Sequence, residues 1–208
     1  MPGILIRTRK LSLYDRLLKR GFDIILSSVC LLLLGWIIVL AYAAAFLDTR
    51  KNGFFTQTRV GKEGKPFKII KVRTMRDIPD ITTTITTVND PRITPLGRVL
   101  RKTKIDELPQ LLNVFTGSMS FVGPRPDVLG FADRLTGEDR IILSIRPGIT
   151  GPATLKYRNE EEIMAGQADT EKFNREVIFP DKVRLNRSYV ENYSFCIDMK
   201  YILRTIIR

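Results

Sequence analysis

The stretch "IILSSVCLLLLGWIIVLAYAAAFL", from Ile24 to Leu47, decides how the rest of the chain must be arranged. It contains no charged residue, and Asp23 and Asp48 close its two ends. A helix rises about 1.5 Å per residue, so this stretch is long enough to cross a hydrocarbon layer of about 30 Å. A buried core helix is the alternative, but apolar residues on every face of such a helix are hard to cover in a chain of 208 residues. The stretch therefore predicts a membrane-embedded helix.

Basic residues flank this stretch on both sides. Six precede it and six follow it closely: Arg7, Arg9, Lys10, Arg16, Lys19 and Arg20, then Arg50, Lys51, Arg59, Lys62, Lys65 and Lys68. Because basic flanks favour the cytoplasmic side of a membrane, both flanks are expected there. A helix that enters, breaks and returns would satisfy both, and Gly35-Trp36 is the natural place for the break. We expect residues 1–20 to form a basic amphipathic arm, with a solvated charged arm as the alternative, and residues 21–49 a re-entrant membrane helix.

The net charge of +12 predicts an anionic partner. Beside a membrane helix, anionic lipid and a phosphorylated substrate are favoured over nucleic acid, because the aromatic residues are not interleaved with the basic ones and no nucleic-acid-binding module is recognisable. The chain has no histidine, and Cys30 and Cys196 support neither a zinc cluster nor a disulfide framework. The roles of base, nucleophile and metal ligand therefore fall mainly to carboxylates.

The chain after the membrane stretch predicts one small α+β domain, mostly helical, over residues 50–208. The expected elements are a β-hairpin, a basic helix, a short helix and a C-terminal amphipathic helix: residues 54–60 and 67–73, 96–102, 106–116, and from about 194 onward. Residues 78–97 are rich in threonine and predict an irregular connection over the site. The C-terminal helix is expected either to lie at the membrane interface or to pack on the core.

Two adjacent carboxylates, Asp106 and Glu107, stand out in "RKTKIDELPQLL", residues 101–112. They follow a cluster of basic residues and precede Leu108, Pro109 and a helical apolar pattern that ends at Gly117. Asp is a favoured N-cap, and acids suit the first turn of a helix, so a capping role is one interpretation. Catalysis is the other, and the absence of histidine makes carboxylate chemistry more plausible.

Arg125 and Arg146 lie in loops stiffened by proline, in "GPRP" and "IRPG". A guanidinium held in a rigid loop suits bidentate phosphate binding. The alternative for each is a structural arginine that pairs with an acid.

The sequence resembles the bacterial sugar transferase family, the small monotopic polyprenyl-phosphate phosphoglycosyl transferases. The resemblance covers nearly the whole chain and rests on five strings: "LLKRGFDIILSS", "FFTQTRVGKEGKPFKIIKVRTM", "NDPRITPLGRVLRKTKIDELPQLLNVFTGSMSFVGPRP", "RPGITG" and "YVENYSFCIDMKYILRT". Two positions depart from the family pattern. Gly35-Trp36 stands where the family has a Ser-Pro break, and Thr154 stands where the family commonly has Gln.

The resemblance implies a two-step reaction at the cytoplasmic face of the bacterial inner membrane. Asp106 would attack a UDP-sugar, release UMP and pass the phosphosugar to polyprenyl phosphate, and Glu107 with Asp106 would hold Mg²⁺. Arg73, Arg101 and Arg125 match basic positions expected to meet phosphates, and Arg146 is added from its rigid loop. The rival hypothesis is a catalytically inactive membrane-anchored protein that binds anionic lipids or assembly partners.

Overall fold

A single long helix, α1 (Leu13–Thr49), includes the predicted membrane stretch and residues 13–20 of the predicted arm. It is seen in a computed structural model that describes residues 11–79, 86–87 and 90–207, so residues 1–10 of the predicted arm and most of the threonine-rich connection lie outside the described residues. The predicted break at Gly35-Trp36 is wrong, because α1 passes through both residues without interruption. Glycine weakens a helix by only about 1 kcal/mol and keeps its N–H, whereas proline removes the N–H and clashes with the preceding turn.

Both ends of α1 are fixed by local hydrogen bonds. Ser12 and Asp15 form a capping box, in which Ser12 Oγ accepts from the Asp15 N–H at 3.1 Å and Asp15 Oδ2 accepts from the Ser12 N–H at 3.2 Å. At the other end Arg50 adopts a left-handed conformation with φ of 55°, and its N–H donates to Phe46 O. The helix therefore begins eleven residues before the apolar stretch and includes part of the basic flank.

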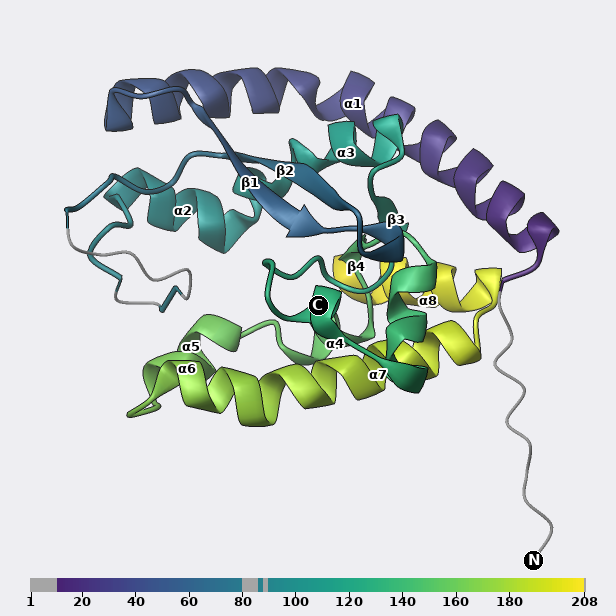
Figure 1. Cartoon of the computed structure of the whole chain (residues 1–208). Helices are drawn as coiled ribbons and strands as arrows, with labels where there is room; N and C mark the ends of the chain where they lie inside the picture. The colour runs from purple at the N-terminus through teal and green to yellow at the C-terminus, as the bar shows by residue number, and fades with distance from the viewer. Residues whose placement is uncertain (1–10, 80–85, 88–89, 208) are drawn as a thin grey trace, which may run out of the picture.

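The helix α1 lies along the domain instead of projecting from it, and the other labelled elements lie on one side of it (Figure 1). Its buried residues recur at helical spacing over most of its length: Lys19, Asp23, Ser27, Ile38, Ala41 and Ala45. The opposite face is apolar and exposed, and includes Leu32, Trp36 and Val39. Among the described residues α1 is the one helix long and apolar enough to cross a membrane. Its packing leaves one face for the domain and one apolar face uncovered.

The predicted β-hairpin is confirmed. Strand β1 (Phe54–Val60) pairs antiparallel with β2 (Pro66–Val72) across the 3₁₀ turn η1 (Lys62–Gly64), and Phe55 lies opposite Lys71. Two further short strands, β3 (Ser120–Val122) and β4 (Gly148–Thr150), pair in parallel. The hairpin lies between α1 and the lower helices in Figure 1.

Helices make up most of the remaining domain, as predicted. In chain order they are α2 (Pro95–Thr103), η2 (Ile105–Glu107), α3 (Gln110–Thr116), η3 (Ala132–Arg134), η4 (Gly137–Ser144), α4 (Pro152–Lys156), α5 (Glu160–Ala165), α6 (Thr170–Phe173), the π-helical turn η5 (Asn174–Ile178), α7 (Phe179–Glu191) and α8 (Phe195–Ile206). The predicted basic helix is α2, the short helix after the carboxylates is α3, and the C-terminal helix is α8. The Ser194 side chain caps α8 by accepting from the Ile197 N–H at 3.3 Å.

Apolar contacts fix the hairpin on three sides and so fix the side chains it presents to the site. Val72 packs with Ala41 and Ala45 of α1 and Leu100 of α2. Ile69 packs with Val114 and Met119 around α3, and Val60 packs with Ile142 and Val183 near η4 and α7. Burial of each such side chain contributes roughly 1.5–3 kcal/mol.

A buried polar network joins α1 to α7 and α8. Lys19 Nζ lies 2.5 Å from Asp198 Oδ2, and Tyr189 donates to Asp198 Oδ1 at 2.6 Å. Farther along α1, Asp23 Oδ1 accepts from Ser120 Oγ at 3.1 Å and from the Phe121 N–H at 3.0 Å. The C-terminal helix therefore packs on the core along one face. Its other face leaves Leu203 and Ile206 exposed.

Candidate active site

Asp106 and Glu107 lie in η2, the turn that joins α2 to α3 at the inner side of the hairpin. Lys104, with φ of 60°, ends α2 and begins η2. Ile105 packs beside the apolar cluster that α1, α2 and β2 share. This contact fixes the turn, and the Glu107 carboxylate that follows faces Lys71 of β2 and Arg125 of the loop after β3.

Glu107 is held ionised by two cations. Its Oε1 accepts from Lys71 Nζ at 3.2 Å and from Arg125 Nη2 at 2.9 Å, and its side chain is 13% exposed. Burial alone would raise the pKa of Glu107, but the charges of Arg125 and Lys71 hold it well below its usual range. Glu107 is therefore a fixed negative charge that orients Arg125 and Lys71.

Asp106 is in a different environment although it is the adjacent residue. It is 7% exposed, and its Oδ1 is buried with no hydrogen-bond partner among the described residues. Burial and the negative charge of Glu107 raise the pKa of Asp106 to about 6, against the opposing charges of Lys71 and Arg101. Because most buried carboxylates are hydrogen-bonded, an unpaired one is a candidate for chemistry.

The capping interpretation of Asp106 is wrong. Within the described chain neither η2 nor α3 has a side-chain cap, and the N-cap positions are occupied by Lys104 and Pro109. The helix that begins after the carboxylates is instead set by Pro109 and stopped by Gly117, with φ of 89°.

Arg125, predicted from its "GPRP" loop, is brought directly to the carboxylate pair. The hairpin holds this loop in place, since Arg59 Nη1 donates to Pro126 O at 3.3 Å and the Val60 N–H donates to Asp127 O at 2.9 Å. Burial and the charge of Arg125 lower the pKa of Arg59 to about 10, so two guanidinium groups share this part of the site. Such a concentration of cations suits a ligand with more than one negative charge.

Lys71 is a site residue that sequence reasoning missed. It lies between Ile70 and Val72 in a strand with an otherwise largely apolar centre, and its side chain is 21% exposed. A lysine at a half-buried strand position needs a partner, and this was the available signal. Its partner, Glu107, lies in an element far along the chain, so the sequence could not predict that the two residues pair.

The other three predicted arginines are dispersed. The charge of Arg101 lowers the pKa of Asp106, but the Arg101 Nη2 bonds to Glu161 Oε1 at 2.5 Å. Arg73 lies at the end of β2, where its Nε donates to Asn52 O at 2.8 Å. Arg146 donates to Gly117 O at 2.7 Å, at the far end of α3 from the carboxylates. The structure therefore groups Arg125 and Arg101 with the carboxylates and leaves Arg73 and Arg146 outside the group.

The carboxylate pair also fits a divalent cation that is brought with a phosphate ligand. No group of three potential metal-ligating side chains occurs within the described ranges, so a protein-only cage is not present there. Mg²⁺, however, is commonly bound by one or two carboxylates, with phosphate and water oxygens completing the shell. The unpaired Oδ1 of Asp106 and the carboxylate of Glu107 supply such a donor set.

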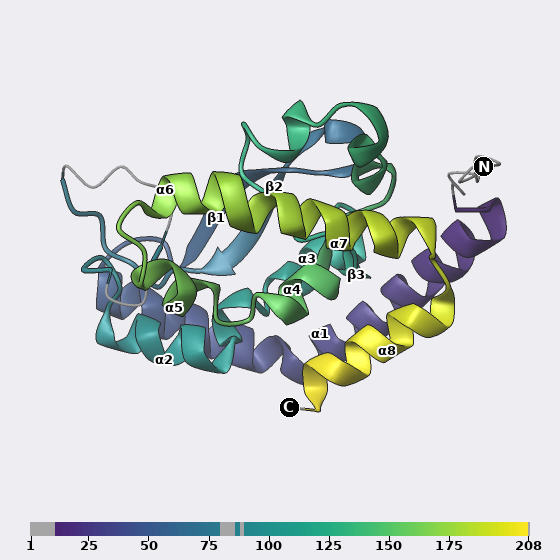
Figure 2. The same cartoon turned by 90° about the horizontal axis from the view of Figure 1, so that it is seen from below.

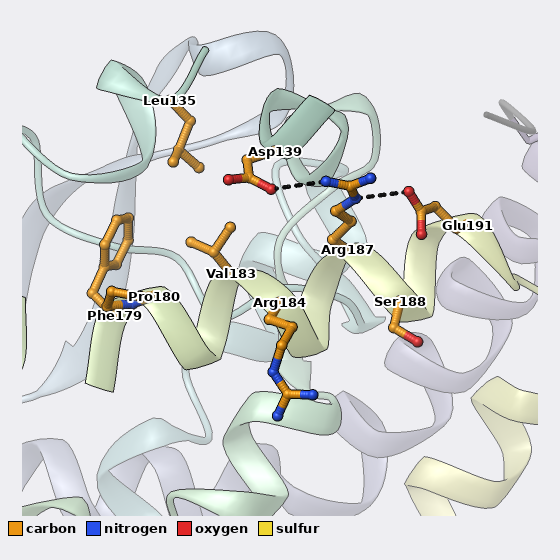
Figure 3. Close-up of a pocket in the computed structure, with 9 residues that line it drawn as sticks. All are labelled: Leu135, Asp139, Phe179, Pro180, Val183, Arg184, Arg187, Ser188 and Glu191. Atoms are coloured by element: carbon orange, nitrogen blue, oxygen red, sulfur yellow. Dashed lines mark hydrogen bonds and ion pairs between the residues drawn. The ribbon is translucent and has the colours of Figure 1, made fainter. Parts of the chain in front are cut away.

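A separate pocket of about 430 Å³ lies between α7 and the segment from η3 to η4 (Figure 3). Arg187 reaches from α7 to Asp139 at 3.3 Å and to Glu191 at 2.8 Å, so the charges that line the pocket compensate one another. None of the predicted site residues lines it. This pocket is therefore distinct from the carboxylate site.

Residues 14–208 match the family described as bacterial sugar transferase, which is nearly the whole chain. The chain belongs to the bacterial sugar transferase family. This family assignment confirms the resemblance seen in the sequence, and it includes the helix α1 as well as the carboxylate site.

Named relatives of this sugar transferase extend the comparison. The exopolysaccharide production protein PSS of Rhizobium leguminosarum bv. phaseoli is 38% identical over 201 residues, which cover 93% of this chain and 95% of the relative. The UDP-glucose:undecaprenyl-phosphate glucose-1-phosphate transferase of Escherichia coli K12 is 35% identical over 213 residues, which cover all of this chain and 43% of the relative. The enzyme of the same description from Caulobacter vibrioides is 36% identical over 192 residues, which cover 90% of this chain and 68% of the relative. The chain thus spans less than half the length of the E. coli protein.

Proposed function

We propose that this sugar transferase moves a sugar phosphate from a UDP-sugar to a polyprenyl phosphate, undecaprenyl phosphate by analogy with its relatives, and releases UMP. The observation that carries the proposal is the contrast between the two carboxylates. Glu107 is bound by Lys71 and Arg125, whereas Asp106 is buried, unpaired and has a pKa raised to about 6. Two carboxylates in such different environments suit two different roles.

Asp106 is the nucleophile in this proposal. At neutral pH a carboxyl with a pKa near 6 is mostly ionised, and because it lacks hydrogen bonds from described residues its oxygen is free to attack. A carboxylate approaches a diphosphate only if the repulsion between their negative charges is removed. Lys71, Arg125 and Arg101 supply positive charge around Asp106 for this purpose.

The transfer balances without a proton donor or acceptor. In the first step an Asp106 oxygen bonds to the β-phosphorus of the UDP-sugar, and the bond from that phosphorus to the bridging oxygen breaks to release UMP. In the second step an oxygen of the polyprenyl phosphate bonds to the same phosphorus, and the bond to Asp106 breaks. Both nucleophiles are already ionised, so the chain, which has no histidine, needs no general base for either step.

Mg²⁺ remains part of the proposal as the cofactor. Asp106 and Glu107 are the residues that would hold it, together with oxygens of the donor diphosphate. When bound, the ion would supply further neutralisation of phosphate charge. Within the chain, Glu107 orients the cations of Lys71 and Arg125.

The exposed apolar face of α1 supports attachment to the cytoplasmic face of the bacterial inner membrane. A helix that packs along the domain and leaves Leu32, Trp36 and Val39 outward can embed that face without crossing the bilayer. A lipid acceptor and a soluble nucleotide sugar would then meet at one interface-bound site. Exopolysaccharide assembly is the proposed pathway class, because relatives carry that description.

The test is release of UMP by the purified protein in nanodiscs with Mg²⁺, undecaprenyl phosphate and a panel of UDP-sugars, beginning with UDP-glucose. Asp106→Asn should abolish the release, while Asp77→Asn, a control at an exposed aspartate, should retain it. Mass spectrometry of wild-type protein without acceptor should find the phosphosugar on Asp106. If no donor yields UMP while the protein is folded and lipid-bound, the rival hypothesis of a non-catalytic membrane-anchored binding protein replaces this one.

A further inference from the structure

The guanidinium of Arg101 forms an ion pair with a carboxylate from a distant element. Arg101 lies in the last turn of α2, and its Nη2 bonds to Glu161 Oε1 at 2.5 Å while Nη1 lies 3.5 Å from Thr74 Oγ1. Glu161 lies in the first turn of α5. In Figure 1 α5 and α2 lie at the same end of the molecule, and in Figure 2 they lie close together.

The cation in this pair belongs to the site around Asp106. The carbonyl oxygen of Arg101 accepts from the Lys104 N–H at 3.1 Å, at the point where η2, the turn that carries Asp106, begins, and the two residues are five positions apart in sequence. A phosphate bound at Asp106 would therefore lie within reach of the Arg101 charge. In the structure, however, that guanidinium is bonded to the carboxylate of Glu161.

The ion pair is of a kind that a phosphate can displace. The Glu161 side chain is 42% exposed and that of Arg101 is 21% exposed, and solvent screening makes ion pairs with such exposure weak. A phosphate oxygen forms a charge-assisted hydrogen bond of the same geometry and carries more negative charge. The adjacent Glu160 stays attached to α7, because its Oε1 lies 2.6 Å from Lys182 Nζ, so Glu161 can release Arg101 while the first turn of α5 remains anchored.

We propose that Glu161 is a built-in competitor for the donor phosphate: it holds Arg101 in the free enzyme and yields it to the diphosphate of the nucleotide sugar. This inference rests on the proposed function, since it takes a nucleotide diphosphate as the ligand. Glu161 thereby sets the affinity of the phosphate subsite, and α5 is linked to α2 until that ligand binds.

The test measures binding of UDP, a non-transferable probe, by isothermal titration calorimetry on the full chain in nanodiscs with Mg²⁺. Glu161→Gln should bind UDP about 3- to 5-fold more tightly than wild type, which is the fold-change that an exposed pair supplies. Glu162→Gln is the matched control, because it removes the same charge from the next, exposed residue and should leave the affinity unchanged.

The coupling must run through Arg101. Arg101→Gln should bind UDP more weakly than wild type, and adding Glu161→Gln to it should change nothing further. Weaker binding by Glu161→Gln would overturn the inference, because Glu161 would then position Arg101 instead of competing for it. An equal gain in Glu162→Gln, or a gain that persists without Arg101, would also overturn it. Failure of every variant to bind UDP would reject the nucleotide-sugar function itself, whereas UDP binding without a Glu161 effect rejects only this inference.

Discussion

The raised pKa of Asp106 means that its ionised form destabilises the folded state. A carboxyl with a usual pKa of 3.8 and a pKa of about 6 in the folded protein loses about 3 kcal/mol of folding free energy at neutral pH. Because the pKa of Asp106 is higher in the folded protein than in the unfolded one, the loss of folding free energy is absent below pH 3.8. It grows between pH 3.8 and 6 and is complete above that range. We therefore expect Asp106→Asn to raise the melting temperature by several degrees while it abolishes UMP release.

Differential scanning fluorimetry at pH 7.5 and pH 5 measures this effect. The gain in melting temperature of Asp106→Asn over wild type should be smaller at pH 5, where the folded wild type already carries the proton. A variant that is less stable than wild type at pH 7.5 would show that Asp106 contributes to packing or hydrogen bonding beyond what its unpaired oxygen indicates.

The same pKa predicts the pH dependence of the first half-reaction. UMP release in single turnover, without acceptor, should fall about tenfold for each pH unit below 6, because the protonated Asp106 is not a nucleophile. Above about pH 7 the rate should be level. Glu107, with its pKa far below this range, stays ionised throughout and adds no inflection there. A rate that stays constant down to pH 5 would contradict the assignment of Asp106 as nucleophile.

Helix α3 separates two arginines that looked equivalent in the sequence. Arg125 bonds to Glu107, near the N-terminal end of α3. At the C-terminal end of α3, Arg146 donates to Gly117 O, and Arg20 donates to Val114 O and Phe115 O. Cations at that end bond to free carbonyls and interact favourably with the negative end of the helix dipole. We therefore expect Arg146 to act as a structural cap and Arg125 to act in the candidate active site.

Substitution to glutamine should separate these roles. Arg146→Gln should lower the free energy of unfolding by about 1–3 kcal/mol, the range for a hydrogen bond with a charged partner, and leave UMP release per folded molecule close to wild type. Arg125→Gln should lower UMP release by at least tenfold, because Glu107 keeps only Lys71 as its partner. Thermal unfolding and initial rates on the same preparations compare the two. Loss of activity in folded Arg146→Gln would support the prediction that Arg146 binds phosphate.

The sequence was sufficient for elements whose signal is local. Two short runs around a glycine-bounded turn predicted the hairpin, a helical apolar pattern that stops at Gly117 predicted α3, and apolar residues spaced among basic ones predicted α8. It was not sufficient where the partner is remote. Lys71 and Glu107, or Arg101 and Glu161, meet only after the chain has folded, and nothing near Arg146 indicates that Gly117 O is its acceptor.

At the scale of the whole molecule, the basic flanks of α1 predicted that both ends of the helix lie on one side of a membrane, and this stays a prediction. The sequence suggested a break at Gly35-Trp36, whereas α1 is continuous and packs along the domain through residues from Lys19 to Ala45. A helix of 37 residues is about 55 Å long, far more than the hydrocarbon thickness of about 30 Å. Its buried face includes the charged Lys19 and Asp23, which are paired with the domain and are incompatible with lipid on that face.

This packing predicts that the start of α1 and the chain that follows α1 face the same compartment. In a variant lacking Cys30 and Cys196, single cysteines at Arg16 and at Lys65, both exposed, should react with an impermeant maleimide in inverted inner-membrane vesicles. Neither should react in intact spheroplasts, where only the outer face of the membrane is accessible. A cysteine at Trp36, on the exposed apolar face, should react poorly in both because lipid covers it. Labelling of Arg16→Cys from the outside and Lys65→Cys from the inside would mean that α1 crosses the membrane, and α1 would then have to leave the face of the domain on which it packs here.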